Sequence, residues 1–527
     1  MCAPIGLMIH RLAWTIAAAL FLTAHPGLAQ EPDIHLEGTV PEGSETHFFV
    51  EFEVPEGIVE IEVRHDDLSE ANILDWGLDD PNGFRGWGGG NREPAVVGID
   101  AASRSYVPGP IPAGTWSVVV GKAQIEETPA PYVIDIFLRT EATLAPQPRA
   151  PYQDPGVLDG EERWYAGDFH VHTRESGDAT PTISEALSFA QGVGLDFVMF
   201  SEHNTNSGLT LYADVQPDFP NLLILPGVEW TTYAGHANAL GATDWVDHKI
   251  GVRGVTAADA IQAYKDQGAL FSINHPLSPG APICIGCGWE IAVDPTVIDG
   301  VEVQSGILRA VSYWEELCAQ GSHAAAIGGS DDHRAGQGTS ILDSPIGTPT
   351  TMVFASQLSV DAILEGVRSG RTVVKVNGPE SPMIETELTG ERIEDTVFAE
   401  AATLSAVVTN GDGRDLQLIK NGDVVETVAI DGDPFTHEMS VEAPEEGEDR
   451  YRYQVMTGSL PDTVGSYVWL RAPEPDVPDA GIPDGGTEPS GDGGCSCRIR
   501  SDADSDMALA FGALLLGVAV WRRRRQP

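Results

Sequence analysis

Between residues 30 and 150, apolar and polar residues alternate with a period of two. The alternation is clearest at His47–Val54, Ile58–Val63, Trp116–Val120 and Tyr132–Leu138. Successive side chains of a β-strand point to opposite faces, so each segment is predicted to be a strand with one buried face. Gly, Pro and Asp residues separate the segments, which predicts a β-sandwich or jelly roll for residues 30–150.

Two stretches of this region lack the alternation. Asp75–Gly90 is rich in Gly, Asp and Trp, and an ordinary long surface loop is the favoured interpretation. A loop that contacts a sugar or another substrate is the alternative. Residues 141–160 contain four prolines and little periodicity. We interpret them as a linker to the next domain.

After the linker, the spacing of apolar residues becomes that of helices packed on strands. Behind a cap predicted at Thr180-Pro181, apolar residues mark one buried helix face: Ile183, Ala186, Leu187 and Ala190. Thr256–Asp259 has the capping-box pattern, and further helices are predicted at Leu308–Ala319 and Val360–Ser369. Strand and helix alternate about seven times, which favours a (β/α) barrel over residues 160–380. A dinucleotide-binding sheet is disfavoured, because no Gly-rich loop follows the first strand.

The period of two returns between residues 381 and 472. Its clearest segments are Thr403–Thr409, Leu416–Lys420, Asp423–Ile430 and Tyr451–Val455. Asn421-Gly422, between two of them, is a dipeptide preferred in two-residue hairpin turns. We therefore expect a second β-sandwich, of immunoglobulin type, over residues 381–472.

Both ends of the chain have the composition of targeting segments. Residues 1–29 contain a basic residue, a short apolar core and small residues at the end, which is the pattern of a secretory signal peptide; a buried first helix is the alternative. Residues 473–494 are rich in Pro, Gly and Asp and are interpreted as a spacer. Within residues 495–527, Cys495 and Cys497 precede an apolar stretch at 507–521 and an arginine cluster. As a helix the stretch would span about 22 Å of a roughly 30 Å bilayer core, so it fits a processing signal or a short anchor.

The charge of the chain narrows the classes of function. The 527 residues carry a formal net charge of -49, which would repel a polyanion. No nucleic-acid scaffold is therefore expected. The acidity is interpreted as a solubility trait of a protein that works outside the cell in a salty medium. The length allows roughly three to four domains.

The chain has six cysteines, and three of them lie in the central region. Cys284 and Cys287 have the spacing of half a zinc knuckle, but no second pair completes it. In an exported protein a local disulfide between the two is the favoured interpretation. Cys318 is an alternative partner for either cysteine, and the sequence leaves this open.

Between Asp168 and His333, metal-ligand residue types recur where apolar runs end. His170 and His172 lie two residues apart on a predicted strand and therefore share a face. Seven more candidates stand in segments rich in Gly, Ser, Asn or Pro: Asp178, His203, Glu229, His236, His275, Asp331 and His333. Scattered exposed polar residues are the alternative, but unpaired charges at buried strand ends are costly. Six of the chain's 14 histidines are among these nine residues, so we expect divalent metal ions at one rim of the barrel.

The same residues stand in motifs that resemble the PHP (polymerase and histidinol phosphatase) superfamily of metallohydrolases, most closely its exported CehA/McbA-like branch. The resemblance covers about Trp164–Asn377, in the motifs His170–Asp178, Ser201–Asn204, Gly227–Glu229, Gly235–Gly241, Asn274–Pro276 and Gly329–His333. It implies a distorted (β/α)7 barrel flanked by the two β-sandwiches. It also implies two or three divalent metal ions, of Zn, Mn or Fe, at the C-terminal rim of that barrel.

The resemblance implies a position for each metal ion. The first is expected at His170, His172, Glu229 and Asp331. The second is expected at Asp178, His203 and His333, and the third at His236, His275 and the bridging Glu229. Many members of the family have histidine where this chain has Asp178, which could weaken or alter one site.

Further roles follow from the same motifs. Asp331 and His333 are expected to act as catalytic residues that move a proton to the leaving group. Many family members have Asp where this chain has Glu202, which is expected to orient His203. Arg174, Arg309 and Arg334 are candidate substrate-binding residues, because a guanidinium suits phosphate. Ordinary surface ion pairs are the alternative for each arginine.

These motifs favour an exported hydrolase whose metal ions activate water to attack a small phosphomonoester or phosphodiester. A carbamate or carboxylic ester hydrolase with the same metal centre is one alternative, and a non-catalytic surface binding protein is another. The tail resembles the C-terminal sorting signal of myxobacterial surface proteins. That resemblance implies attachment at the cell surface or outer membrane through Cys495 or Cys497, with membrane contact before processing and sorting machinery as a partner.

Overall fold

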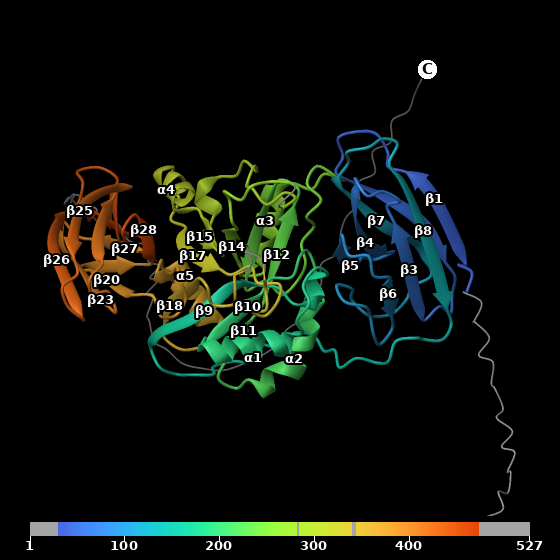
Figure 1. Cartoon of the computed structure of the whole chain (residues 1–527), viewed down its shortest axis with the longest axis horizontal. Helices are drawn as coiled ribbons and strands as arrows, with labels where there is room; N and C mark the ends of the chain where they lie inside the picture. Colours follow the sequence, from blue (N-terminus) through green and yellow to red (C-terminus); the bar gives the residue numbers. More distant parts are fainter. Residues whose placement is uncertain (1–29, 282–283, 340–343, 474–527) are drawn as a thin grey trace, which may run out of the picture. The chain divides into compact units, whose positions relative to one another are not determined.

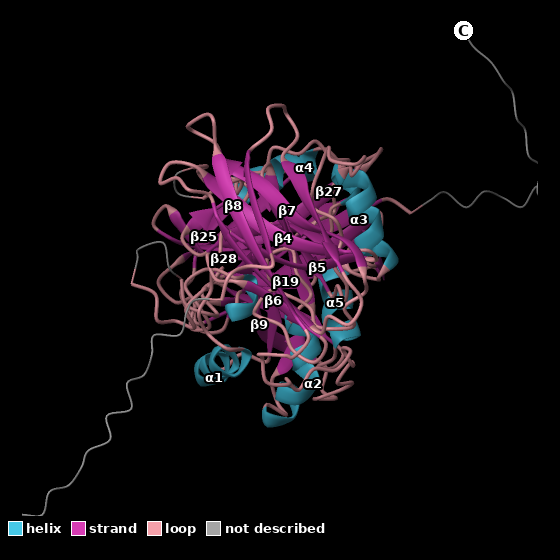
Figure 2. Cartoon of the chain, turned by 90° about the vertical axis from the view of Figure 1, so that its right-hand side faces the viewer, coloured by secondary structure: helices cyan, strands magenta, loops and turns pink. Residues whose placement is uncertain are grey.

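The computed structural model describes residues 30–281, 284–339 and 344–473. Three predicted segments lie outside the described residues: the signal peptide, nearly all of the spacer, and the sorting signal with Cys495, Cys497 and residues 507–521. No helix in the described part is long and apolar enough to cross a membrane. Strands make up most of the regular secondary structure in the described part, and helices are few (Figure 2).

The N-terminal segment forms two four-stranded antiparallel sheets (Figure 1). One sheet has the order β1 (Ile34–Thr39), β8 (Pro131–Arg139), β3 (Glu60–Asp66) and β6 (Ala95–Gly98). The other has the order β2 (His47–Val54), β7 (Gly114–Gln124), β4 (Ile73–Asp80) and β5 (Gly83–Gly89). Alternate apolar residues of both sheets pack into one core, where Ile61, Trp116 and Ile136 are fully buried. The strands predicted from the alternation are present.

Asp75–Gly90 is mostly a β-hairpin made by β4 and β5, not a loop. The strands could not be predicted from the sequence, because the segment contains several glycines and glycine is uncommon in strand interiors. The glycines are needed for packing: a Cβ on Gly77 would lie 2.5 Å from the Trp87 ring, and one on Gly86 would lie 2.5 Å from the Tyr106 ring. The close approach of these aromatic rings therefore requires glycine at both positions.

The central segment contributes strands to two open sheets. The first contains, in spatial order, β11 (Leu223–Leu225), β10 (Phe197–Phe200), β9 (Arg163–Val171), β18 (Thr350–Ala355) and β19 (Thr372–Lys375). The second contains β12 (Gly227–Thr232), β13 (Gly235–Leu240), β14 (Leu270–Ile273) and β15 (Gly300–Ser305), and β15 also pairs with β16 (Leu308–Arg309) and β17 (Ala325–Gly329).

The described strands lie in open sheets, so the distorted (β/α)7 barrel that the family resemblance implies is not confirmed. β18 runs antiparallel to β9, and β13 runs antiparallel to both β12 and β14. The isolated bridges Val171↔Asp332 and His203↔Glu229 link the two sheets. Apolar runs reveal strands but not their direction. A short hairpin such as β12–β13 therefore looks the same in sequence as two strands of a parallel barrel.

The described part contains five α-helices and four short 3-10 helices. The α-helices are α1 (Ile183–Val193), α2 (Tyr212–Val215), α3 (Ala257–Asp266), α4 (Val311–Ala319) and α5 (Val360–Arg368). The 3-10 helices are η1 (Arg174–Ser176), η2 (Gly208–Leu211), η3 (Gln216–Asp218) and η4 (Pro295–Val297). Apolar faces of α1, α3, α4 and α5 pack into the cores beside the central strands.

The helix boundaries agree with the sequence in part. The predicted cap at Thr256 is confirmed, since its hydroxyl accepts the Asp259 N–H. The cap of α1 is Thr182, in a capping box with Glu185, and not Thr180-Pro181. The helix predicted from Leu308 begins at Val311, because Leu308–Arg309 pairs with β15 as β16.

The C-terminal segment also forms two groups of strands. β20 (Met383–Leu388), β23 (Ala401–Thr409) and β26 (Phe435–Glu442) make one sheet. The other group contains β21 (Glu391–Ile393), β22 (Thr396–Phe398), β24 (Asp415–Lys420), β25 (Asp423–Ala429), β27 (Glu448–Thr457), β28 (Leu460–Gly465) and β29 (Val468–Arg471). β28 pairs with β19, so this group continues the first central sheet into a twelve-stranded sheet.

The hairpin turn predicted at Asn421-Gly422 is confirmed. Both residues have positive φ, 53° and 93°, and they join β24 to β25. Positive φ at both central residues is what a two-residue hairpin of type I′ requires.

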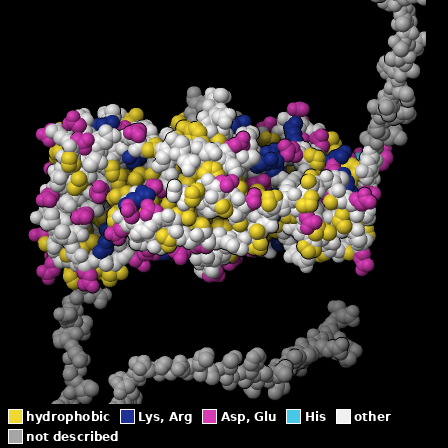
Figure 3. All heavy atoms as spheres, turned by 90° about the horizontal axis from the view of Figure 1, so that it is seen from below, with side chains coloured by type: hydrophobic (Ala, Val, Ile, Leu, Met, Phe, Trp, Pro, Cys, Tyr) yellow, Lys and Arg dark blue, Asp and Glu magenta, His cyan; other side chains and the backbone are white. Residues whose placement is uncertain are grey.

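Acidic side chains are spread over the face shown in Figure 3, with Lys and Arg side chains between them. Some basic groups are paired: Arg163 lies 2.8 Å from Asp196, and Arg414 lies 2.7 Å from Asp462. The chain has 79 acidic residues and 30 Lys and Arg residues, so most carboxylates have no basic partner of their own. The surface is therefore expected to repel polyanions.

His323 links the central and C-terminal strands through two ion pairs. Its ring nitrogens lie 2.9 Å from Asp395 and 2.9 Å from Glu448, and the ring stacks on Trp469 at 3.8 Å. Burial would lower the pKa of His323, but its hydrogen bonds to the two carboxylates raise it to about 9. The charged form therefore stabilises the fold below pH 6.5, and this contribution is lost as the pH rises through about 9.

We expect His323→Gln to lower the Tm by a few degrees at pH 6 and by less at pH 10, because the ion pairs are already lost at the higher pH. Thermal unfolding of both proteins at the two pH values measures this. An equal loss at both pH values would show that stacking on Trp469, and not charge, is the stabilising interaction.

Candidate metal centre

Strand β9 carries two predicted ligands into the interior. His170 and His172 share one face of the strand, and both are 0 % exposed. Their Nε2 atoms lie 3.0 Å apart. Val171, between them, packs into the apolar core on the opposite face. Two imidazole nitrogens that point to one place are the arrangement that a divalent cation needs.

The turn after β17 brings a carboxylate to the same place. Asp331 Oδ1 lies 3.2 Å from His170 Nε2 and 3.1 Å from His172 Nε2. The backbone of Asp331 has a positive φ of 56°, and its N–H donates to the His170 carbonyl at 2.8 Å. This bond holds a conformation that is uncommon for a residue other than glycine. The side chain of Asp331 is 35 % exposed, so solvent reaches the group here.

Glu229, on β12, lies at the centre of the cluster. Its carboxylate is fully buried, and one oxygen lies 2.6 Å from His203 Nδ1. Four more imidazole nitrogens lie within 3.7 Å of the carboxylate: those of His236 at 3.3 Å, His170 at 3.5 Å, His275 at 3.5 Å and His172 at 3.7 Å. One carboxylate that touches five imidazoles is placed to bridge separate cation positions.

Asp178 pairs with two histidines at the exposed side. Its Oδ2 atom lies 3.2 Å from His203 Nε2 and 3.4 Å from His333 Nε2. His172, His203 and His333 also have donor atoms within 4.8 Å of one another. The Asp178 side chain is 56 % exposed, so this part of the cluster also opens to solvent.

His236 and His275 complete the cluster on its buried side. His236 is the second residue of β13, and His275 follows β14 with a positive φ of 27°. The Nδ1 atom of His275 lies 3.2 Å from the Cys287 carbonyl, which leaves Nε2 directed at Glu229. Such a hydrogen bond fixes the tautomer of a ligating histidine.

Burial and neighbouring charges shift the pKa values of the clustered residues, often in opposite directions. Burial would raise the pKa of Glu229, but the neighbouring His203, His170 and His236 hold it well below its usual value. Burial would lower the pKa of His170, but Glu302, Asp331 and Glu229 raise it well above its usual value. Burial and the charges of His333 and His203 lower the pKa of His172 to about 3. The cluster therefore contains an ionised carboxylate and a neutral imidazole, and both of these can donate to a cation.

The structure brings all nine predicted ligands into one connected cluster. Arg174 is exposed on η1 and lines a separate hollow with Arg104, Arg149 and Glu175. Arg309 and Arg334 are exposed as well. The arrangement of the described residues thus gives no support for Arg174 as a substrate-binding residue of this cluster.

Several residues that form hydrogen bonds with the ligands were not predicted from the sequence. Ser176 Oγ lies 2.7 Å from His172 Nδ1, and Thr231 Oγ1 lies 2.9 Å from His203 Nδ1. The expected partner of His203, Glu202, instead accepts hydrogen bonds from the backbone and hydroxyl of Thr173, at 3.1 and 2.5 Å. Neighbouring residues at a strand end point in opposite directions, so Glu202 contacts Thr173 and not the adjacent His203.

Glu302 is the most important of the missed residues. It lies within β15 and is 0 % exposed. Its Oε1 atom lies 2.7 Å from His170 Nδ1, and its Oε2 atom accepts the His275 N–H at 2.9 Å. One carboxylate therefore orients residues of two parts of the cluster. A carboxylate between two valines, Val301 and Val303, was the signal in the sequence.

We expect Glu302→Gln to weaken metal binding by about 10- to 100-fold, because loss of the charge makes His170 a poorer donor and disturbs its orientation. Competition with a metal-binding dye measures the affinity. Glu316→Gln, at an exposed position of α4, is the matched control. Equal affinities of the two variants would contradict the orienting role of Glu302.

The β4–β5 hairpin of the N-terminal segment packs against the loops of the cluster. Asp75 Oδ2 accepts a hydrogen bond from the Tyr233 hydroxyl at 2.6 Å. Gly177, just before Asp178, has a φ of 93°, and a Cβ on it would lie 2.8 Å from the Gly88 carbonyl oxygen. The hairpin therefore fixes the loop that carries Asp178.

Comparison with known proteins gives distant similarities only. No family model matches the chain. An uncharacterised protein of Methanocaldococcus jannaschii is 27 % identical over 146 residues, which cover 26 % of this chain and 79 % of that protein. A Bacteroides vulgatus two-domain structure with a predicted PHP-like metal-dependent phosphoesterase is 21 % identical, covers 61 % of this chain and 99 % of its own, and has a TM-score of 0.35.

A second solved structure, described as a metal-dependent phosphoesterase of Bifidobacterium adolescentis, is 18 % identical. It covers 32 % of this chain and 87 % of its own, with a TM-score of 0.24. Both TM-scores are too low to carry a functional argument. Any function must therefore be argued from the cluster itself.

Proposed function

We propose that the chain is a metal-dependent hydrolase of phosphomonoesters or phosphodiesters that belongs to the CehA/McbA-like branch of the PHP superfamily. The observation that carries the proposal is the convergence of six imidazoles and three carboxylates, far apart in sequence, on one connected cluster. The order and motifs of these residues support the family, and the open sheets of the central segment would be a distorted form of its barrel.

The donors fit divalent metal ions. The Nε2 atoms of His170 and His172 converge with Asp331 Oδ1 within about 3.2 Å, and the buried Nε2 of His236 has no partner among the described residues. Mixed nitrogen and oxygen donors suit Zn, Mn and Fe. Two or three ions would be held by the three residue groups implied by the family resemblance, with Glu229 between them.

When bound, divalent ions at these positions would bring the pKa of a water molecule to roughly 7 and neutralise charge on an ester oxygen. The chain's own residues set where this happens. Asp331 and His333 have side chains 35 % and 25 % exposed, so the substrate would approach on their side. His333 donates its Nδ1 hydrogen to the Asp331 carbonyl, which leaves its Nε2 atom facing Asp178 at 3.4 Å. From there Asp331 or His333 would pass a proton to the leaving group.

An assay of the purified chain tests this proposal. The substrates are p-nitrophenyl phosphate, bis-p-nitrophenyl phosphate and 1-naphthyl carbamate, each with Mn, Zn or Fe. We expect turnover of a phosphate ester and its loss in His170→Ala, with both flanking β segments still folded. Turnover of the carbamate alone would replace the phosphoesterase with a carbamate hydrolase. No turnover and no bound metal would leave a non-catalytic binding protein.

We further propose that the protein is exported and held at the cell surface or outer membrane through its tail. The support is the pattern of residues 1–29 and 495–527. The amino terminus of the protein recovered from the cell envelope is expected near Gln30. A chain that still begins at Met1 would contradict export through a cleaved signal.

A further inference from the structure

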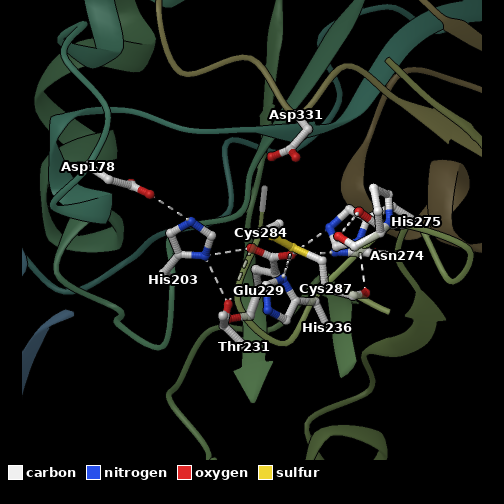
Figure 4. The surroundings of a disulfide bond; sticks show 12 residues. Asp178, His203, Glu229, Thr231, His236, Asn274, His275, Cys284, Cys287 and Asp331 are labelled. Carbon is white, nitrogen blue, oxygen red and sulfur yellow. Dashed lines mark hydrogen bonds and ion pairs between the residues drawn. A yellow bond between two sulfur atoms is a disulfide. The ribbon is translucent and has the colours of Figure 1, made fainter. Parts of the chain in front are cut away.

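A disulfide lies directly against the buried side of the cluster. Figure 4 shows Cys284 and Cys287 beside Glu229, His236 and His275. Cys287 Sγ lies 3.9 Å from His236 Nδ1. Donor atoms of Cys287, His236 and His275 all lie within 4.8 Å of one another, and the three residues are 3–4 % exposed. Nitrogen and sulfur donors at such distances can bind one cation without moving the backbone far.

The loop that carries Cys287 is fixed against the β12–β13 hairpin. Gly286 has a φ of 75°, and a Cβ on it would lie 2.4 Å from the Thr232 carbonyl oxygen. The Glu290 N–H donates to the Ala234 carbonyl at 2.7 Å, and the Trp289 N–H donates to the Pro276 carbonyl at 3.1 Å. These contacts therefore hold the Cys287 Sγ atom in a fixed position beside His236.

Both histidines are prepared to bind a cation at this place. The Cys287 carbonyl accepts the Nδ1 hydrogen of His275 at 3.2 Å, which leaves its Nε2 lone pair free. His236 is buried, and its Nδ1 atom faces the same place, 3.3 Å from Glu229 Oε1 and 3.9 Å from Cys287 Sγ.

We propose that Cys287, when the disulfide is reduced, becomes the thiolate ligand of the cation held by His236, His275 and Glu229. The inference rests on the proposed metal centre and adds a sulfur donor to one of its positions. A thiolate binds Zn²⁺ strongly, whereas a disulfide sulfur has no negative charge to offer. The dithiol form would fill the fourth position of this cation. The disulfide form would leave that position open for water or substrate, as a catalytic site requires.

An ordinary dithiol compound can reduce the Cys284–Cys287 disulfide by thiol–disulfide exchange. Cys284 is half-buried and Cys287 is buried, so a reductant thiolate attacks Cys284 Sγ. The Cys284–Cys287 bond breaks, a mixed disulfide forms on Cys284, and Cys287 leaves as a thiolate beside the cation. The second thiol of the reductant then releases Cys284 as a thiol and becomes a cyclic disulfide. Two electrons pass from the reductant to the cystine, and a bound cation favours Cys287 as the leaving group.

Cobalt(II) substitution of the full chain tests the proposal, because a thiolate ligand adds a charge-transfer band in the near ultraviolet. Wild type, Cys284→Ser and Cys287→Ser are compared with and without a phosphine reductant. Cys284→Ser cannot form the disulfide, so its Cys287 thiolate is always available. Cys318→Ala is the control for an unrelated thiol, since burial raises the pKa of Cys318 to about 12 and keeps it protonated.

We expect the band in wild type only after reduction, in Cys284→Ser under both conditions, and in Cys287→Ser under neither. Cys318→Ala should behave as wild type. Any other cysteine of the chain is common to the two serine variants, so a difference between them reports Cys287. Bound cobalt and ester hydrolysis without a band in Cys284→Ser would overturn this inference and leave the proposed function intact. No bound cobalt in wild type would overturn both.

Discussion

Replacing Glu229 with glutamine is expected to reduce kcat/KM for the ester substrate by about 10³-fold or more. Glutamine keeps the size of the side chain but removes the negative charge that lies within 3.7 Å of five imidazole nitrogens. If Glu229 bridges two cation positions, both positions lose a donor in a single substitution. The amide can still donate hydrogen bonds to neighbouring imidazoles, so the fold should survive.

The comparison is made with wild type and with Glu316→Gln, in which an exposed glutamate of α4 undergoes the same chemical change. Steady-state kinetics and metal content are measured on all three proteins, and circular dichroism reports the fold. We expect Glu229→Gln to lose both activity and metal while Glu316→Gln retains both. Undiminished activity of folded Glu229→Gln would show that Glu229 is not part of the reacting centre.

Removal of metal is expected to lower the Tm strongly, and more so at pH 8 than at pH 6. A ligand at a thousand times its Kd stabilises the folded state by about 4 kcal/mol. In the metal-free protein, burial opposes protonation of His170 and His203, but nearby carboxylates raise both pKa values well above the usual range. Those protons stabilise the metal-free fold at low pH, and their contribution falls as the pH rises.

Metal binding must displace the same protons, so the metal affinity increases with pH. Both effects widen the difference in Tm between the metal-loaded and the chelated protein as the pH rises. Differential scanning calorimetry with added Mn or Zn, and separately with EDTA, measures this difference at pH 6 and pH 8. A difference that is absent, or that narrows toward pH 8, would contradict cation binding by these histidines.

The residues of the candidate site could be predicted from the sequence, whereas the sheet topology could not. His170 and His172 could be assigned to one face because strand geometry fixes the direction of alternate side chains. Most of the other seven ligands stand near the ends of apolar runs, and runs of that kind end at sheet edges where loops converge. Strand direction has no such signature. The antiparallel pairing of β18 with β9 and of β13 with β12 could therefore not be predicted.

Contacts between distant segments were also beyond the sequence. Cys284 and Cys287 were correctly expected to form a local disulfide, but its place beside His236 depends on how the loop after β14 folds back onto β13. The hydrogen bond from Tyr233 to Asp75 on the N-terminal hairpin also joins segments that are distant in sequence, so it could not be predicted. Only Glu302 had a local signal, as a carboxylate between Val301 and Val303.

The metal content of the purified chain tests the central claim most directly. Elemental analysis is carried out on wild type and on Glu229→Gln, each prepared without chelators. The account predicts two or three equivalents of Zn, Mn or Fe in wild type and a clear loss in the variant. Less than one equivalent in wild type, or the same content in both proteins, would contradict a metal centre built around Glu229.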